Sequence, residues 1–188
     1  MGHSQAEKAQ SRERILAEAS AELRENGLES LSVGRLMQSV NLTHGGFYGH
    51  FESRSELIKA ALKRALVDGA AASRATSGSD RPRSITAIAK SYLSRTHRDN
   101  PKSGCAIAAL VSDVARADIE TRAIMEEHIE QFISGITQTI DDDSDDTALV
   151  AVSALVGGLI LSRVITRTSR SDAVLRVVRD HVVAIADE

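Results

Sequence analysis

Residues 31–57 read LSVGRLMQSVNLTHGGFYGHFESRSEL, and this stretch decides the fold of the N-terminal part of the chain. Ser32 is a good N-cap for a short helix that ends at Asn41. The apolar residues of that helix recur at helical spacing, which predicts a buried face made of Val33, Leu36, Met37 and Val40. Thr43 is a second N-cap and predicts a very short helix that runs to about Gly49. Two short capped helices joined by a tight turn form the arrangement in which one helix crosses the DNA backbone and the next enters the major groove.

The second short helix is unusual because Gly45 and Gly46 lie inside it. Each glycine in a helix interior costs about 1 kcal/mol relative to alanine, so some benefit must offset them. Bare backbone lets a helix approach a partner closely, and the free amides at a helix N-terminus favour phosphate groups. The side chains of Thr43, Tyr48 and His50 add donors for phosphate. The alternative is that the two glycines only form a tight turn.

Helices are predicted on both sides of this stretch. The first runs from about Ala9 to Glu25, and Asn26-Gly27 supplies the residues that close it. Its apolar residues are Ile15, Leu16, Ala19 and Leu23. Ser53-Arg54-Ser55-Glu56 is a capping box, and it begins a long helix that runs to about Ser73.

The remainder of the chain is also predicted to be helical. Ser73 to Arg83 is a solvated linker, Asn100 to Gly104 is a turn, and Asp141 to Asp146 is an acidic loop. Five further helices are marked by apolar residues at helical spacing, around Ile85–Leu93, Ile107–Val114, Ile129–Ile140, Ala148–Ile165 and Ser171–Ile185. The fold class predicted from about nine helices and no strand is therefore all-α.

The charge of the chain excludes indiscriminate binding to nucleic acid, because the formal net charge at pH 7 is -3. Residues 1–64 carry nine Lys and Arg against eight Asp and Glu, whereas the remainder carries fourteen against eighteen. This asymmetry suits a local DNA-binding module at the N-terminal end.

Other bulk features favour a soluble protein of the cytoplasm. The single cysteine, Cys105, excludes an internal disulfide and a Cys-based structural zinc site. The N-terminal residues contain no apolar run typical of a signal peptide. Ala148 to Ile165 is apolar, but its two glycines and Arg163 favour a helix buried on most sides over a membrane span.

Residues 12–58 resemble the N-terminal domain of the TetR family of bacterial repressors. The residues that carry the resemblance are Arg12, Ile15, Leu16, Ala19, Leu23, Gly27, Ser32-Val33, Leu36, Val40, Leu42-Thr43, Gly45, Phe47-Tyr48, His50-Phe51 and Ser53-Arg54-Ser55-Glu56-Leu57. The resemblance implies a three-helix DNA-binding domain with a helix-turn-helix at residues 1–53. It also implies a helical ligand-binding and dimerisation domain at residues 54–188.

The resemblance further assigns residues to DNA. Ser32, Thr43, Tyr48 and His50 are expected to contact phosphates, and His44, Gly45 and Gly46 are expected to face base edges. Arg35 would reach a base or a phosphate, and Arg54 replaces the lysine usual in the family. Phe47 and Phe51 are interpreted as core residues. Lys8, Arg12 and Arg14 form either a basic arm or, because Glu7 and Glu13 alternate with them, a charge-mixed solvated face.

The second domain of the family holds a small-molecule effector. Candidates for the lining of its cavity are Tyr92, His97, Cys105, Met125, His128 and Phe132, with ordinary packing as the alternative for each. Cys105 follows Gly104 at a predicted helix N-terminus, where thiolate chemistry is favoured. A sensor of electrophiles or oxidants is therefore an alternative to a buried small hydrophobic residue.

The resemblance also implies a homodimer through the last two helices, at about 147–168 and 172–187. Ala154, Gly158 and Ser162 fall four residues apart with Gly157 adjacent, which predicts a surface where two helices pack closely. Two recognition helices would then lie one DNA turn apart, roughly 34 Å, on a palindromic operator.

No motif predicts an enzyme, a metal site or a cofactor. His128 with Glu130 lacks a second histidine at helical spacing, and Asp141, Asp143 and Asp145 lack the glycine and glutamate of a calcium loop. The predicted function is a ligand-responsive transcriptional repressor released from DNA by a small molecule. A transcriptional activator and a helical ligand-binding protein without DNA function remain as alternatives.

Overall fold

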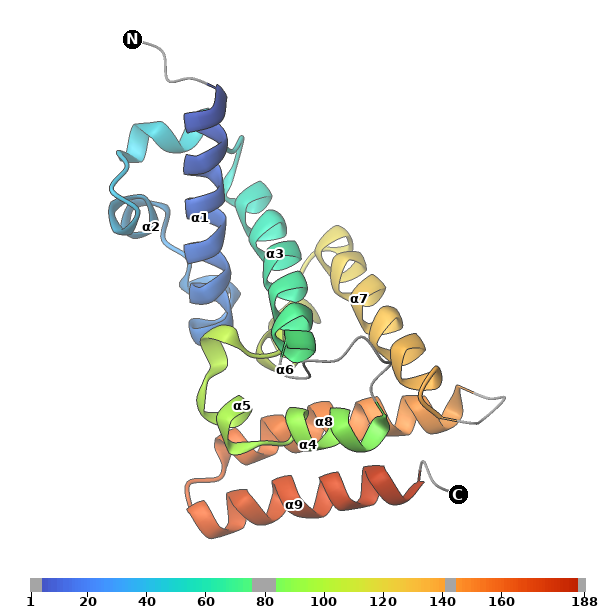
Figure 1. Cartoon of the computed structure of the whole chain (residues 1–188). Coiled ribbons are helices and arrows are strands. Elements are labelled where there is room, and N and C mark those ends of the chain that lie inside the picture. The colour runs from blue at the N-terminus through green and yellow to red at the C-terminus, as the bar shows by residue number, and fades with distance from the viewer. Residues whose placement is uncertain (1–4, 76–83, 141–144, 186–188) are drawn as a thin grey trace.

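The computed structural model describes residues 5–75, 84–140 and 145–185, and every regular element in these ranges is helical (Figure 1). The α-helices are α1 (Gln5–Asn26), α2 (Val33–Ser39), α3 (Arg54–Ala75), α4 (Ile85–Tyr92), α5 (Arg95–Asp99), α6 (Ala106–Val114), α7 (Ile119–Thr137), α8 (Asp146–Val164) and α9 (Thr168–Ile185). Short 3₁₀ helices are η1 (Leu28–Ser30), η2 (His44–Gly49) and η3 (Pro101–Ser103). The predicted all-α fold class is confirmed.

Several boundaries differ from the prediction, each for a physical reason. The helices α1 and α9 begin earlier than predicted, because their first turns carry no apolar residues to mark them. The short helix α5 was not predicted, since it contains no buried residue. The helix predicted after Thr43 is the 3₁₀ helix η2. The helix α3 extends to Ala75, and the rest of the predicted linker, residues 76–83, lies outside the described residues.

The predicted caps around the decisive stretch form in part, since Thr43 caps η2 but Ser32 precedes α2 without a side-chain cap hydrogen bond. Asn41, two residues after the end of α2, adopts the left-handed conformation, with φ of 57°. The Glu56 amide donates a hydrogen bond of 3.1 Å to the Ser53 hydroxyl, which is the first half of the predicted capping box. The Glu56 carboxylate instead accepts from the amide of Glu52, one residue before the cap, at 2.6 Å. These contacts fix where α3 starts after η2.

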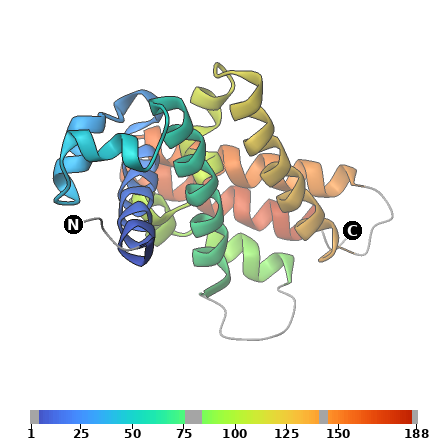
Figure 2. The same ribbon diagram turned by 90° about the horizontal axis from the view of Figure 1, so that it is seen from above.

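Two apolar clusters form the core. The first joins α1, α2, η2 and α3 to α6, and the second joins α4 and α7 to α8 and α9. The helix α6 contributes to both, with Leu110 in the first cluster and Ala108 in the second. Figure 1 shows α1, α2 and α3 at one end of the molecule and α8 and α9 at the other, and Figure 2 also shows α8 lying beside α9. The helix α6 therefore connects the packing of the two ends.

Polar contacts fasten α1 to the middle of the molecule. The Arg24 guanidinium is 7% exposed and donates hydrogen bonds to the carbonyls of Lys102 in η3 and Ala65 in α3. After α1, Gly27 adopts φ of 85°, a left-handed conformation that favours glycine. The next amide, of Leu28, donates to the carboxylate of Asp113 in α6 at 3.0 Å. The N-terminal helices are therefore held to η3 and α6 by specific hydrogen bonds.

The helix α8 is long and apolar enough to cross a membrane, a property that core helices of soluble proteins share. In the single chain, 39% of the most apolar 18-residue stretch of α8 is buried, so the prediction of burial on most sides is wrong. Its exposed apolar side chains include Val150, Leu161 and Val164. One face of α8 packs in the core and the other carries apolar groups to the surface.

The small residues of α8 do not form the exposed surface that their spacing predicts. A Cβ at Gly158 would lie 3.0 Å from a methyl group of Val178 in α9, so Gly158 allows close packing of α8 and α9 within the chain. Ser162 is buried, and its carbonyl accepts a hydrogen bond from the Ser171 hydroxyl at 2.6 Å. Gly157, one residue along, has no atom within 4 Å of such a Cβ. The small residues of α8 therefore mainly contact α9 of the same chain.

Candidate functional site

The helix η2 presents a short polar face supported from behind by aromatic rings. The Thr43 hydroxyl caps η2 by accepting a hydrogen bond from the Gly46 amide at 3.2 Å. Phe47 is 2% exposed and stacks on the ring of Phe51, with the ring centroids 5.6 Å apart. Tyr48, the next residue after Phe47, is 69% exposed. The core interpretation of Phe47 and Phe51 agrees with their burial.

We call the exposed residues Thr43, His44, Gly45 and Tyr48 the η2 face. The rings of His44 and Tyr48 meet edge to face with centroids 6.5 Å apart. A Cβ at Gly45 would have no atom within 4 Å, so the glycine is not needed for packing in the free protein. A bare, open backbone position flanked by hydroxyl and imidazole groups is suited to close contact with a polar partner.

The remaining residues predicted to contact DNA lie around this face in different settings. Gly46 is half-buried, and Ser32 is half-buried at the start of α2 without capping it through its side chain. Arg35 is exposed and donates a hydrogen bond to the Ser30 carbonyl at 3.1 Å. Arg54 donates to the carbonyls of Leu31, at 3.1 Å, and of residues 28 and 29. Arg54 thus fastens the start of α3 to η1.

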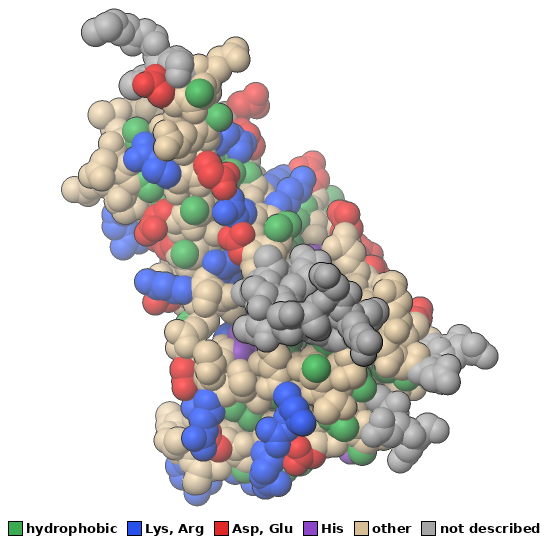
Figure 3. Space-filling model, viewed as in Figure 1, with side chains coloured by type: hydrophobic (Ala, Val, Ile, Leu, Met, Phe, Trp, Pro, Cys, Tyr) green, Lys and Arg blue, Asp and Glu red, His purple; other side chains and the backbone are tan. Residues whose placement is uncertain are grey.

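His50 lies next to cations from α1. Its Nδ1 atom is buried without a hydrogen-bond partner. The pKa of His50 is lowered, first by desolvation and then by the positive charges of Lys8 and Arg12. The Arg12 guanidinium stacks 4.6 Å from the Phe51 ring centroid and pairs with Glu56 at 3.5 Å. Figure 3 shows acidic and basic side chains interspersed over α1 on the visible face, in keeping with the charge-mixed interpretation.

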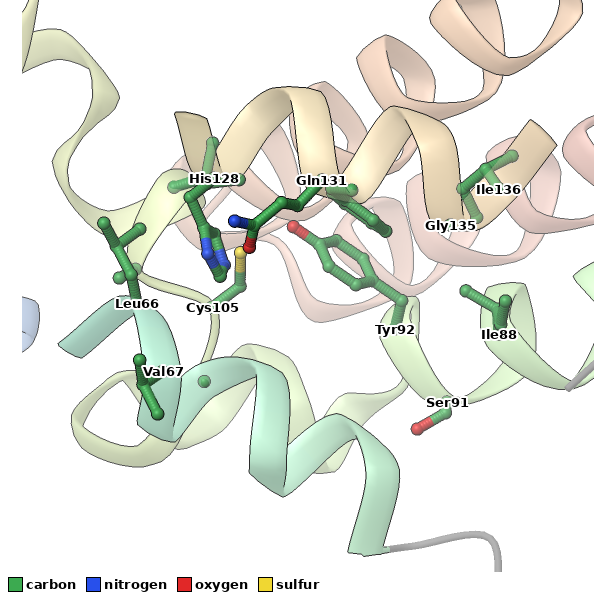
Figure 4. A pocket seen from close by; sticks show the side chains of 14 residues that line it. Leu66, Val67, Ile88, Ser91, Tyr92, Cys105, His128, Gln131, Gly135 and Ile136 are labelled. Atoms are coloured by element: carbon green, nitrogen blue, oxygen red, sulfur yellow. The ribbon is translucent and has the colours of Figure 1, made fainter. Parts of the chain in front are cut away.

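A cavity of about 320 Å³ lies between α3, α4, α6 and α7 (Figure 4). Four of the six predicted residues line it, namely Tyr92, Cys105, His128 and Phe132. Met125 is buried in the first apolar cluster and is not among the lining residues. His97 lies behind the wall, in contact with Tyr92 and Cys105. No Asp, Glu, Lys or Arg occurs among the described residues that line the cavity.

His97 joins two parts of the cavity wall. The Cys105 amide donates a hydrogen bond to Nε2 of His97 at 2.9 Å, and Nδ1 of His97 lies 2.7 Å from the Tyr92 carbonyl. Because Nε2 accepts, the neutral ring carries its proton on Nδ1 and donates it to that carbonyl. The pKa of His97 is lowered, chiefly by desolvation, with a smaller contribution from the charge of Arg163. His97 is therefore a neutral connector.

Tyr92 is the buried polar group that points into the cavity. Its ring stacks on Phe132, with centroids 5.7 Å apart, and its hydroxyl is buried without a hydrogen-bond partner of ordinary geometry. The pKa of the phenol is raised well above its usual value, first by burial and then by the neighbouring Cys105 thiol. In Figure 4 the hydroxyl projects from α4 towards the region where the Cys105 sulfur and the Gln131 amide also lie.

Sequence reasoning missed several lining residues, above all Gln131 and the glycines of α3 and α7. His128, Gln131 and Gly135 follow one another at spacings of three and four residues, so they share one face of α7. This face of polar and small residues was the pattern that could have predicted them as lining residues. Gly69 of α3 lies where a Cβ would be 3.0 Å from the Gly104 carbonyl oxygen. No pattern in the sequence predicts this close approach of α3 to the Gly104 carbonyl.

Comparison with known proteins gives a consistent result. Residues 15–61 match the family model described as bacterial regulatory proteins, tetR family. A comparison with curated protein sequences gives no match. The chain is similar over 100% of both chains to a TetR-family transcriptional regulator from Cytophaga hutchinsonii, with a TM-score of 0.78 and 19% identity.

Two further solved structures show the same likeness. A TetR regulator from Legionella pneumophila has a TM-score of 0.73 and 22% identity, covering 99% of this chain and 100% of that one. The reduced form of E. coli NemR has a TM-score of 0.71 and 20% identity, covering 92% of this chain and 95% of that one. Residues 15–61 therefore match the tetR family of bacterial regulatory proteins, and the chain as a whole has the fold that these solved TetR-family structures share.

Proposed function

We propose that this protein is a cytoplasmic, ligand-responsive transcription regulator without enzymatic activity. It acts as a repressor that binds a palindromic DNA operator as a homodimer and is released by a small molecule. The observation that carries the proposal is the η2 face, where open glycine backbone and exposed polar side chains lie on a rigid aromatic support.

The η2 face has the chemistry for DNA contact. Thr43 and Tyr48 offer hydroxyl donors for phosphate oxygens, and His44 with bare Gly45 would face base edges. Ser32, Arg35, Gly46, His50 and Arg54 complete the proposed contact set. Because η2 carries few long side chains that could read base edges, we assign part of the specificity for the operator sequence to recognition of DNA shape.

The homodimer is proposed to form through α8 and α9. The exposed apolar side chains Val150, Leu161 and Val164 of α8 and Val177 of α9 lie on these two helices. Gly157, with open space above it, lies on α8 between Val150 and Leu161. A single short recognition helix makes too few contacts for specific binding at cellular salt, so DNA binding requires two copies about 34 Å apart.

The proposed coupling between effector and DNA runs through α3. This helix supplies Leu66, Val67 and Gly69 to the cavity and begins directly after η2. The close approach of Gly69 to the Gly104 carbonyl leaves α3 little freedom to move independently of the Cys105 turn. A ligand that displaces this contact shifts η2, and a preference of a few kcal/mol for the non-binding shape is enough to release DNA.

The test compares Gly45→Ala with the wild type on duplexes from the upstream region of the protein's own gene, at several salt concentrations. The wild type is expected to bind with an affinity that falls steeply with salt, because phosphate contacts release counterions. Gly45→Ala leaves the free protein folded, since its new methyl group meets no atom within 4 Å, but it weakens binding where the backbone approaches DNA.

The matched control is Gly135→Ala, which adds a methyl group to equally open space on α7, far along the chain from η2. It is expected to retain the DNA affinity of the wild type in the absence of effector. A monomeric protein, or one that ignores these duplexes even in dilute buffer, would overturn the proposal and favour a helical ligand-binding protein without DNA function.

A second candidate function is a redox- or electrophile-sensing regulator that acts through Cys105. The observation that favours it is the position of Cys105, which lines the cavity and is the N-cap of α6. A similar structure, that of E. coli NemR, is described as a reduced form. If alkylation leaves the operator affinity of the wild type and of Cys105→Ser equally unchanged, the sensor function is excluded.

A further inference from the structure

We propose that the cavity binds a neutral, largely apolar compound through a carbonyl oxygen that accepts a hydrogen bond from the Tyr92 hydroxyl. The proposal rests on the proposed function, because it names the chemical class of the effector. It is tested by ligand binding alone, so that its outcome is separate from that of the DNA experiments.

The first step is the unpartnered hydroxyl of Tyr92. Tyr92 is 5% exposed, and its hydroxyl has no hydrogen-bond partner of ordinary geometry, although the Cys105 thiol, a weak acceptor, lies beside it. Buried polar groups are nearly always hydrogen-bonded, because an unpaired donor loses its water without a replacement. Burial and the adjacent thiol of Cys105 raise the pKa of this phenol, so it remains a protonated donor at physiological pH. The missing partner is therefore an acceptor atom.

The second step is the absence of charged side chains among the described residues that line the cavity. The described lining residues include no Asp, Glu, Lys or Arg, so a charged ligand would find no counter-charge among them. The nearby guanidinium of Arg163 donates to the carbonyls of His97, at 3.0 Å, and Arg98, at 3.2 Å. Although the positive charge of Arg163 partly offsets the rise in the pKa of Tyr92, the Arg163 side chain lines a different surface groove, beside Ser162 and Thr166, and is not among the residues that line this cavity. A carboxylate ligand is therefore disfavoured.

The third step concerns the shape and the other polar groups. The cavity of about 320 Å³ is at the small end of the range of about 300–1,000 Å³ for small-molecule sites. Most of the wall is apolar, including Leu66, Ile88, Ile107 and Ile136, and Phe132 lies stacked on the Tyr92 ring. A compact or flat apolar skeleton fits such a wall.

A carbonyl oxygen suits the Tyr92 hydroxyl better than an alcohol does. An alcohol oxygen would also accept the hydrogen bond, but it brings a second donor that itself needs a partner in an apolar space. A carbonyl group accepts without adding a donor. The Gln131 amide, which also points into the cavity in Figure 4, offers a second polar position for a ligand that carries another oxygen.

The experiment measures binding of three probes by titration calorimetry: acetophenone, ethylbenzene and benzoate. Acetophenone and ethylbenzene share a carbon skeleton and differ in the carbonyl group. Acetophenone is expected to bind the wild type about three- to tenfold more tightly than ethylbenzene, which corresponds to one net hydrogen bond. Benzoate is expected to bind more weakly than acetophenone.

Tyr92→Phe is expected to abolish the preference for acetophenone while retaining the binding of ethylbenzene. Because this variant deletes an unpaired hydroxyl, its thermal unfolding should match or exceed that of the wild type, which verifies the fold. Tyr48→Phe, which alters the exposed tyrosine outside the cavity, is the matched control and should retain the preference. Gly135→Leu, which fills open space in the cavity wall, should abolish binding of both neutral probes.

The proposal is overturned if neither neutral probe binds, if both bind the wild type equally, or if the preference survives in Tyr92→Phe. Tighter binding of benzoate than of acetophenone also overturns it, in favour of an anionic ligand. A protein that binds acetophenone as expected but no DNA would support this inference and contradict the proposed function, so the two failures are distinguishable.

Discussion

The backbone amide of Cys105 donates a hydrogen bond of 2.9 Å to Nε2 of His97, and this one contact fixes the state of the histidine ring. With Nε2 as acceptor, the ring proton lies on Nδ1 and is donated to the Tyr92 carbonyl at 2.7 Å. One neutral imidazole thus joins the end of α4 to the start of α6 and holds two lining residues of the cavity in place.

Acidification is expected to destabilise this connection. Desolvation, followed by the charge of Arg163, lowers the pKa of His97 below its ordinary value of 6.5. Above that value both the folded and the unfolded chain hold a neutral ring, and the full stability is present. As the pH falls from 6.5 through the lowered pKa of the folded state, His97 binds a proton more readily in the unfolded chain than in the folded chain. The free energy of unfolding therefore decreases.

Urea unfolding at pH 7.5 and pH 5.5 measures this loss. His97→Gln removes the titrating group and should lose less stability between the two pH values than the wild type. His44→Gln, which removes an exposed histidine of η2 away from the proposed dimer interface, serves as the control and should behave as the wild type. Equal losses in the wild type and in His97→Gln would show that His97 does not contribute.

Arg24 is expected to be essential for holding α1 against η3 and α3. Its guanidinium donates to the carbonyls of Lys102 and Ala65, so Arg24→Met leaves two carbonyls without their donor. Loss of such buried contacts costs about 1–3 kcal/mol. The free energy of unfolding from urea titration checks this loss, and at moderate temperature the variant should also show weaker coupling between effector and DNA.

The control for Arg24 is Arg35→Met. Arg35 is exposed, and its ion pair with Glu22 is long, at 3.9 Å. Its replacement is expected to change the free energy of unfolding by less than about 0.5 kcal/mol. If both variants lose the same free energy of unfolding, the buried hydrogen bonds of Arg24 contribute no more to stability than the exposed contacts of Arg35.

Leu161→Glu is expected to convert the proposed dimer into a monomer. Leu161 is 57% exposed on α8 of the single chain, so a carboxylate there is solvated in the monomer but buried in an α8–α9 interface. Sedimentation or light scattering measures the change. Ile119→Glu, at an exposed apolar position at the start of α7, should leave the dimer intact. A dimer that survives Leu161→Glu places the interface elsewhere.

Local chemistry made the N-terminal half of this fold predictable. Capping residues such as Thr43 and Ser53 act within one turn, and apolar spacing locates buried faces such as that of Phe47. The all-α class followed from the same signals, whereas only four of the fourteen lining residues of the cavity were predicted, from their aromatic, polar or polarizable side chains. Because the helix α5 has no buried residue, periodicity could not reveal it.

The arrangement of distant residues was not predictable in the same way. The contact of His97 with Cys105, the approach of Gly69 to Gly104 and the three carbonyls bound by Arg54 depend on the tertiary path of the backbone. The direction of Gly158 was predicted wrongly, because spacing shows that small residues share a face but not which neighbour that face meets.

The neighbouring glycines of α8 provide the sharpest test of that correction. In Gly158→Ala the new methyl carbon would lie 3.0–3.3 Å from three side-chain atoms of Val178, including its Cβ, and a β-branched side chain cannot rotate away from all three. Overpacking costs about 1–3 kcal/mol, of which the better helix propensity of alanine returns up to about 1 kcal/mol. In Gly157→Ala the methyl carbon meets no atom within 4 Å, so only the gain from the better helix propensity of alanine remains.

Both substitutions are best made in the Leu161→Glu background, because unfolding of a dimer also depends on protein concentration. There Gly158→Ala should lower the free energy of unfolding, and Gly157→Ala should raise it by about 0.4–1 kcal/mol. The two variants differ by one position on the same helix, so helix propensity alone predicts the same change for both. A gain in stability in both Gly158→Ala and Gly157→Ala would mean that α9 packs less closely on α8 than the contact of Gly158 with Val178 requires. The face of α8 that carries its small residues would then again be available to a second copy of the chain.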